Sequence, residues 1–137
     1  MKIIAEIVPI RADGKMIFQQ RDDIPGITNP GLVSAFGGSA EQGETPIQAV
    51  LREGEEELGL RLTPDDIFLF KQYRKTTEIY GEDSDVYYFV ADGIDDSGLI
   101  VIEGKGSVLF DPTSSIDIKV TPMLRKFIED YKAWRKL

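Results

Sequence analysis

The sequence predicts an α/β fold in which a mixed β-sheet is covered by two helices. Segments with strand character recur along the chain, and two segments carry helix-start signals, one near the middle and one near the C-terminus. Strands interleaved with helices favour a sheet with helices on its faces. A length of 137 residues predicts a single domain, 1–137, with a substantial core.

The first two strands are expected to form a hairpin. Residues 2–10 and 15–21 are mostly apolar, and the "ADGK" between them contains the Asp13-Gly14 pair that is typical of a tight turn. Residues 22–31 are rich in proline and glycine and predict a loop. The segment after that loop begins extended and ends glycine-rich.

The clearest helix is predicted over residues 46–58. Thr45 is suited to the N-cap, Pro46 to the first helical position, and Gln48 completes a capping box. Gly59 supplies the C-terminal stop.

The rest of the chain predicts further strands and a last helix. Strands are expected around 66–75 and 85–91, with shorter ones near 99–103 and 107–110. Thr121-Pro122 opens the last helix. The apolar residues at helical spacing that we expect to face the core are Met123, Leu124, Phe127, Ile128, Tyr131 and Trp134.

Composition excludes several kinds of site and partner. The chain has no cysteine, which excludes disulfides and is compatible with the cytoplasmic location we expect. It has no histidine, so carboxylates and backbone carbonyls would have to hold any metal. A net charge of −8 argues against binding of duplex nucleic acid. No apolar run approaches the roughly 18–20 residues of a membrane span, and no signal peptide is expected at the N-terminus.

The middle helix should have two distinct faces. At about 100° per residue, the side turned to the core carries Ile47, Val50, Leu51, Gly54 and Leu58. Another arc carries Glu53, Glu56 and Glu57 at spacings i, i+3 and i+4, where like charges repel by a few tenths of a kcal/mol per pair. A solvated acidic stripe is one interpretation. The other is a site for Mg²⁺ or Mn²⁺, which would turn this repulsion into attraction.

The spacing of charges and glycines around this helix resembles a known family motif. Gly38 is followed at fixed intervals by Glu44, Arg52-Glu53 and Glu56-Glu57, and then by Gly59-Leu60. The stretch "GGSAEQGETPIQAVLREGEEELGL" is similar to the Nudix box, G-x5-E-x7-R-E-U-x-E-E-x-G-U, in which U is bulky and aliphatic. The one departure is Gly54, at a U position.

The resemblance implies a Nudix-type α/β/α sandwich that uses Mg²⁺, with Mn²⁺ as the alternative ion. The implied activity is hydrolysis of the diphosphate linkage in a small-molecule nucleotide, such as a modified (d)NTP or a nucleotide sugar. Many members of the family dimerise, so the resemblance allows a homodimer here, although the sequence itself does not show the oligomeric state. A non-catalytic nucleotide sensor and an acidic interaction module are the alternatives.

The resemblance also assigns roles inside the box. Glu56 and Glu57 are the expected principal metal ligands, and Glu53 is expected to bind metal directly or through water. The carbonyl of Gly37 or Gly38 is a further expected ligand. An ion pair of Arg52 with Glu44 should orient these carboxylates.

Residues outside the box complete the expected site. Glu103, or failing that Glu82, matches the additional glutamate of many family members, which binds metal or acts as general base. Arg21 resembles an arginine that lies near the substrate phosphates, although a plain surface role is equally compatible. The candidates for stacking on a base are Phe36, Tyr73, Tyr80, Tyr87 and Tyr88. Gly54 predicts a packing feature, because a neighbouring bulky side chain would have to fill the volume it leaves.

Overall fold

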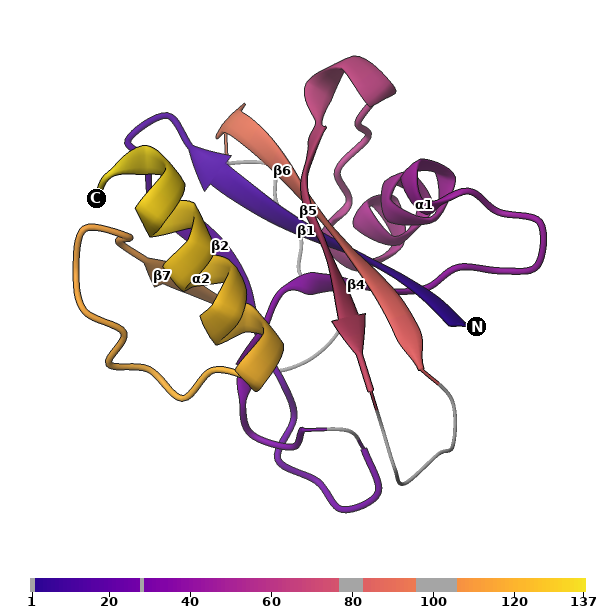
Figure 1. The fold of residues 1–137 in the computed structure, drawn as a ribbon, viewed down its shortest axis with the longest axis horizontal. Coiled ribbons are helices and arrows are strands. Elements are labelled where there is room, and N and C mark those ends of the chain that lie inside the picture. The colour runs from indigo at the N-terminus through magenta and orange to yellow at the C-terminus, as the bar shows by residue number, and fades with distance from the viewer. Residues whose placement is uncertain (1, 28, 77–82, 96–105) are drawn as a thin grey trace.

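The computed structural model describes residues 2–27, 29–76, 83–95 and 106–137. A β-sheet runs through the molecule, with one helix on each side of it (Figure 1). In chain order the elements are β1 (Lys2–Arg11), β2 (Met16–Gln20), β3 (Val33–Ser34), β4 (Phe36–Ser39), α1 (Pro46–Leu58), a 3-10 turn (Pro64–Asp66), β5 (Phe68–Lys75), β6 (Ser84–Ile94), β7 (Ser107–Phe110) and α2 (Pro122–Arg135). The α/β prediction is confirmed. The strand expected near 99–103 falls outside the described residues.

The sheet is mixed, as expected. Its described strands follow the order β3-β2-β1-β6-β5, with β4 paired to β1 and β7 paired to β2. β1 and β6 run parallel, whereas the other strand pairs are antiparallel. The predicted hairpin joins β1 to β2, and the N–H of Arg11 closes its turn by donating to the carbonyl of Lys15 at 2.9 Å.

Alternation along β1 divides the interior into two cores. Ala5 and Ile7 pack in one cluster with residues of α1, whereas Val8 and Ile10 belong to another cluster that contains the buried face of α2. This division follows from the two-residue period of a strand, which sends successive side chains to opposite faces. α1 and α2 therefore cover opposite faces of the sheet, which is the sandwich arrangement expected.

The signals at both ends of α1 are satisfied as predicted. The Gln48 N–H donates to Thr45 Oγ1 at 3.3 Å, and the Thr45 N–H donates to Gln48 Oε1 at 3.0 Å. Gly59 ends the helix with φ 68°, a left-handed conformation that glycine adopts without strain. These local contacts fix the ends of the helix that carries the acidic face.

Two packing predictions are wrong. Trp134 is 56% exposed and lies at the end of α2, with its ring centroid 5.5 Å from that of Phe70 rather than within the core. Helical spacing gives the side on which Trp134 lies but not where the sheet beneath it ends. Gly54 is buried, yet a Cβ placed there would have no neighbour within 4 Å, so no bulky side chain fills its volume.

Candidate active site

The end of β4 brings two glycines against the carboxylate face of α1. Gly37 has φ 143°, and a Cβ at this position would collide with the carbonyl oxygen of Ala5 on β1. A Cβ on Gly38 would lie 2.7 Å from Glu53 Oε1. Only residues without a side chain therefore allow the strand to approach both β1 and the Glu53 carboxylate this closely.

Arg52 holds several carboxylates of the box at once. Its Nε donates to Glu44 Oε2 at 2.8 Å and its Nη2 to Glu44 Oε1 at 3.0 Å, which is the expected ion pair. Its Nη1 lies 3.2 Å from one oxygen of Glu53 and 3.2 Å from one oxygen of Glu56. The Arg52 guanidinium lowers the pKa of Glu44 to about 2, and a hydrogen bond from the Glu41 N–H lowers it as well. Glu44 therefore stays ionised as a partner that orients Arg52.

The three glutamates of the acidic face differ in their surroundings. Glu57 is 4% exposed, and its Oε2 accepts a 2.8 Å hydrogen bond from the N–H of Gly37. Glu53 is mostly buried against Gly38, whereas the side chain of Glu56 is 58% exposed. Two carboxylates are thus held in place by the protein, and the third faces solvent.

These carboxylates are the right kind of donors for Mg²⁺ or Mn²⁺. Both ions prefer carboxylate oxygen, carbonyl oxygen and water, and Gly38 lies against the Glu53 carboxylate. In their present positions, no three carboxylates within the described ranges lie close enough to hold one ion. Arg52 Nη1 contacts both Glu53 and Glu56. The carboxylates are therefore of the kind that these ions bind, and holding one ion with three of them would require a rearrangement of their side chains.

A cleft of about 600 Å³ opens beside this carboxylate face. It begins at Gly37, Gly38 and Ser39 and extends over the sheet to the N-terminus of α2. The cationic side chains that line it are Lys2, Arg21 and Lys75. This volume is in the range of small-molecule sites. Arg21, the predicted phosphate contact, is therefore one of the residues that line this cleft.

Glu6 and Ser34 also line this cleft, and the sequence did not single them out. Burial raises the pKa of the Glu6 carboxyl well above its usual value, and the nearby Glu57 carboxylate raises it further. The sequence feature that could have pointed to Glu6 is its position as the lone acidic residue inside the apolar strand "KIIAEIVPI". Nothing in that pattern shows which residues face Glu6 across the sheet.

The aromatic candidates are placed less favourably than expected. Phe36 is 0% exposed and packs in the core beneath α1, so the prediction that its ring stacks on a base is wrong. Tyr73 is buried and donates its hydroxyl to Asp130 at 2.7 Å. Tyr88 is buried too, but it lines the cleft, whereas Tyr87 packs against the core on the α1 side. Tyr80, Glu82 and Glu103 lie outside the described residues.

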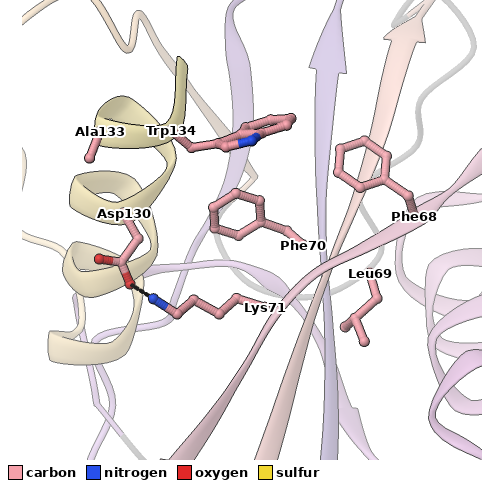
Figure 2. Close-up of a pocket in the computed structure, with 7 residues that line it drawn as sticks. All are labelled: Phe68, Leu69, Phe70, Lys71, Asp130, Ala133 and Trp134. Atoms are coloured by element: carbon pink, nitrogen blue, oxygen red, sulfur yellow. Dashed lines mark hydrogen bonds and ion pairs between the residues drawn. The ribbon is translucent and has the colours of Figure 1, made fainter. Parts of the chain in front are cut away.

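A second hollow lies away from the box. Figure 2 shows this groove, of about 460 Å³, between β5 and α2. Its lining is formed by Phe68, Leu69, Phe70, Lys71, Asp130, Ala133 and Trp134. Lys71 and Asp130 form an ion pair of 3.1 Å across it (Figure 2). No predicted site residue lines this groove.

Comparison with known proteins agrees with the box and the fold. The family model described as NUDIX domain matches residues 2–121. A MutT protein from Methanosarcina mazei Go1 superposes with a TM-score of 0.79 at 20% identity, over 99% of this chain and 96% of its own. A MutT NUDIX hydrolase from Burkholderia pseudomallei gives 0.77 at 22% identity, over 93% and 95%. An Ap4A hydrolase from C. elegans gives 0.73 at 16% identity, over 99% and 98%.

No curated protein sequence is significantly similar to this chain. No helix among the described residues is long and apolar enough to cross a membrane. The solved structures share the fold at low identity, and the family model covers most of the chain. With the box residues gathered as described, the chain is a member of the Nudix hydrolase family.

Proposed function

We propose that this Nudix hydrolase cleaves the diphosphate linkage of a nucleoside diphosphate derivative in a Mg²⁺-dependent reaction. The observation that carries the proposal is the position of the α1 carboxylates beside a cleft that also contains cations. Gly38 lines the cleft and lies against Glu53, while Arg21 and Lys75 line the same cleft. A phosphorylated ligand can therefore contact positive side chains while its diphosphate lies next to the carboxylate face.

The metal ligands in this proposal are Glu53, Glu56 and Glu57, with a carbonyl of Gly37 or Gly38. A bound Mg²⁺ or Mn²⁺ would neutralise the diphosphate and lower the pKa of the attacking water. The N–H of Gly37 keeps one Glu57 oxygen oriented, and Arg52 restrains Glu53 and Glu56. Outside the box, we propose Glu103 as the further carboxylate, with Glu82 as the alternative.

The phosphates are the part of the substrate that the cleft cations would bind. Arg21 and Lys75 line the cleft, where they would offset the charge of a nucleotide in a chain whose net charge is −8. Tyr80 stays a proposed base contact. The panel for testing substrates consists of NTPs, oxidised dNTPs, ADP-ribose, dinucleoside polyphosphates and nucleotide sugars. Release of a nucleoside monophosphate from one class, in the presence of Mg²⁺ and not of EDTA, would support the proposal.

A non-catalytic nucleotide sensor is the second candidate. The same cleft and cations would serve it, so calorimetry is required alongside turnover. Tight nucleotide binding by a protein that hydrolyses no member of the panel would favour the sensor. Failure to bind Mn²⁺ at about millimolar concentration would favour the third candidate, an acidic interaction module.

The homodimer and the cytoplasmic location stay predictions. Sedimentation velocity at several protein concentrations would detect a dimer as a species of about twice the monomer mass of 15.3 kDa. Cell fractionation would test the location.

A further inference from the structure

Two residues that line the proposed substrate cleft each have a buried polar atom without a hydrogen-bond partner. The atoms are Glu6 Oε2 and Ser34 Oγ, and in the described part of the chain no other buried side-chain nitrogen or oxygen lacks a partner. A buried polar atom without a partner costs about 1–3 kcal/mol, and folded proteins contain few of them. That both residues line one cleft indicates groups that a ligand, rather than the protein, satisfies.

The position of Glu6 links the cleft to the proposed chemistry. On β1 it pairs with Gly37 of β4 on one side and with Tyr88 of β6 on the other. The N–H of that glycine holds Glu57, and Arg21 lines the same cleft as Glu6. A ligand that occupies the cleft beside Gly37 therefore lies close to Glu6.

Part of the remaining lining is apolar. Ile4, Val86 and Met123 give the cleft apolar walls, with Glu6 and Ser34 among them. Mostly apolar pockets with a few placed polar groups orient a ligand through those groups. A diphosphate beside Gly38 would leave the nucleoside in this part of the cleft, a placement that rests on the proposed function.

We propose that Glu6 and Ser34 contact the hydrogen-bonding edge of the substrate base, and that the protein therefore prefers bases with an exocyclic amino group. A carboxyl group keeps an accepting oxygen whether or not it carries a proton, so in either state it can accept from an N–H donor of the ligand, and in the ionised state it can only accept. Guanine, adenine and cytosine present such an amino group. Uracil presents a carbonyl at the position where cytosine has its amino group, and hypoxanthine lacks the 2-amino group of guanine. The Ser34 hydroxyl can donate to the adjacent ring atom.

Matched nucleotide pairs test this preference directly. GTP and ITP differ only in the 2-amino group, and CTP and UTP differ in the 4-substituent and in the proton that uracil carries on N3. We expect wild-type kcat/KM to favour the amino member of at least one pair by about tenfold or more, as for a buried base contact. In Glu6→Ala the ratio should fall towards one, mainly through a higher KM for the amino substrate. Ser34→Ala should lower the ratio less.

Two further variants separate recognition from folding and net charge. Glu6→Gln keeps the size of the side chain and one accepting oxygen, so it should retain part of the preference. Glu129→Ala removes an exposed carboxylate on α2 outside the cleft and should leave the ratio at the wild-type value. Melting temperatures of all variants show whether each is folded.

Binding measurements distinguish failure of this inference from failure of the proposed function. Calorimetry of GMP against IMP, and of CMP against UMP, requires no turnover. Binding that favours the amino member and loses this preference in Glu6→Ala would sustain the inference even if no nucleotide were hydrolysed. Hydrolysis without an amino preference, or with a preference that Glu6→Ala leaves intact, would overturn it while the proposed function stood. The absence of both binding and hydrolysis in folded wild-type protein would overturn both.

Discussion

The N–H of Gly37 on β4 donates a 2.8 Å hydrogen bond to Oε2 of Glu57 on α1. This contact joins the strand of the box to its helix, and it orients a carboxylate that is almost fully buried. Because Gly37 also lies against Ala5 and Glu6 of β1, the position of this carboxylate depends on how β4 packs in the sheet.

Alanine substitutions at the two glycines of β4 should have different effects. Gly37→Ala introduces a Cβ at φ 143° that collides with the Ala5 carbonyl, so it should destabilise the fold by about 2 kcal/mol or more. Gly38→Ala meets only the end of the Glu53 side chain, which can move. Its stability should change by less than about 1 kcal/mol, while displacement of Glu53 should lower kcat by about 100-fold.

Chemical denaturation and turnover of both variants make the comparison. Equal losses of stability would contradict the difference assigned to the two glycines. A fully active Gly38→Ala protein would show that the position of Glu53 is not critical.

Arg52→Lys should weaken metal binding without unfolding the protein. Lysine cannot reproduce the two hydrogen bonds to Glu44 while also contacting Glu53 and Glu56. Loss of an orienting partner of this kind lowers metal affinity or activity by about 10–100-fold. Mn²⁺ titration measures the change. Arg61→Lys, at an exposed pair with Glu55, is the matched control and should bind Mn²⁺ like wild type.

Gly54→Ala should stabilise the protein. The position is helical and a Cβ there has no neighbour within 4 Å, so alanine adds helix propensity of about 1 kcal/mol without a clash. Gly43→Ala is a useful control, because its Cβ also meets open space but its φ of 83° strains an alanine. The expected result is a higher melting temperature for Gly54→Ala and a lower one for Gly43→Ala. A lower value for Gly54→Ala would mean that this space is not available.

Tyr73→Phe should lower stability in a pH-dependent manner. The Tyr73 hydroxyl donates to Asp130 at 2.7 Å and lowers the pKa of that carboxyl, with a smaller contribution from Lys71. A lowered folded-state pKa gives stability that is present above the usual value of 3.8 and is lost as the pH falls through the folded value. The variant should therefore be less stable by about 1 kcal/mol near neutral pH. This difference in the free energy of unfolding should shrink in acid. Urea unfolding of both proteins near neutral pH and in acid measures it, and a difference that stayed constant would contradict the role given to this hydrogen bond.

The sequence predicted those parts of the fold that depend on local signals. Thr45, Pro46, Gln48 and Gly59 gave both ends of α1 correctly, because caps act over a few residues. Trp134 was misplaced because helical spacing gives a direction and not the extent of the sheet. Gly54 was misread for a similar reason, since the spacing places it on the buried side without revealing what lies opposite.

The candidate site also has parts that local sequence signals predict and parts that depend on contacts between distant segments. The Glu44–Arg52 ion pair could be expected from the box, because loop and helix are neighbours in the chain. Glu6 could not, because its proximity to Gly37 and Glu57 arises from strand pairing across about thirty intervening residues. Phe36 was wrongly assigned to the base because alternation along a short strand does not say which face carries the cleft.

The most direct test of the account is Mg²⁺-dependent turnover of the nucleotide panel by wild type and Glu57→Gln. Glutamine keeps an oxygen that can accept from Gly37 but removes the charge, so the variant should melt near wild type. We expect wild type to release a nucleoside monophosphate from at least one class, and Glu57→Gln to lose about 1,000-fold or more in kcat. Folded wild-type protein without activity on any class, or a fully active Glu57→Gln, would contradict the account.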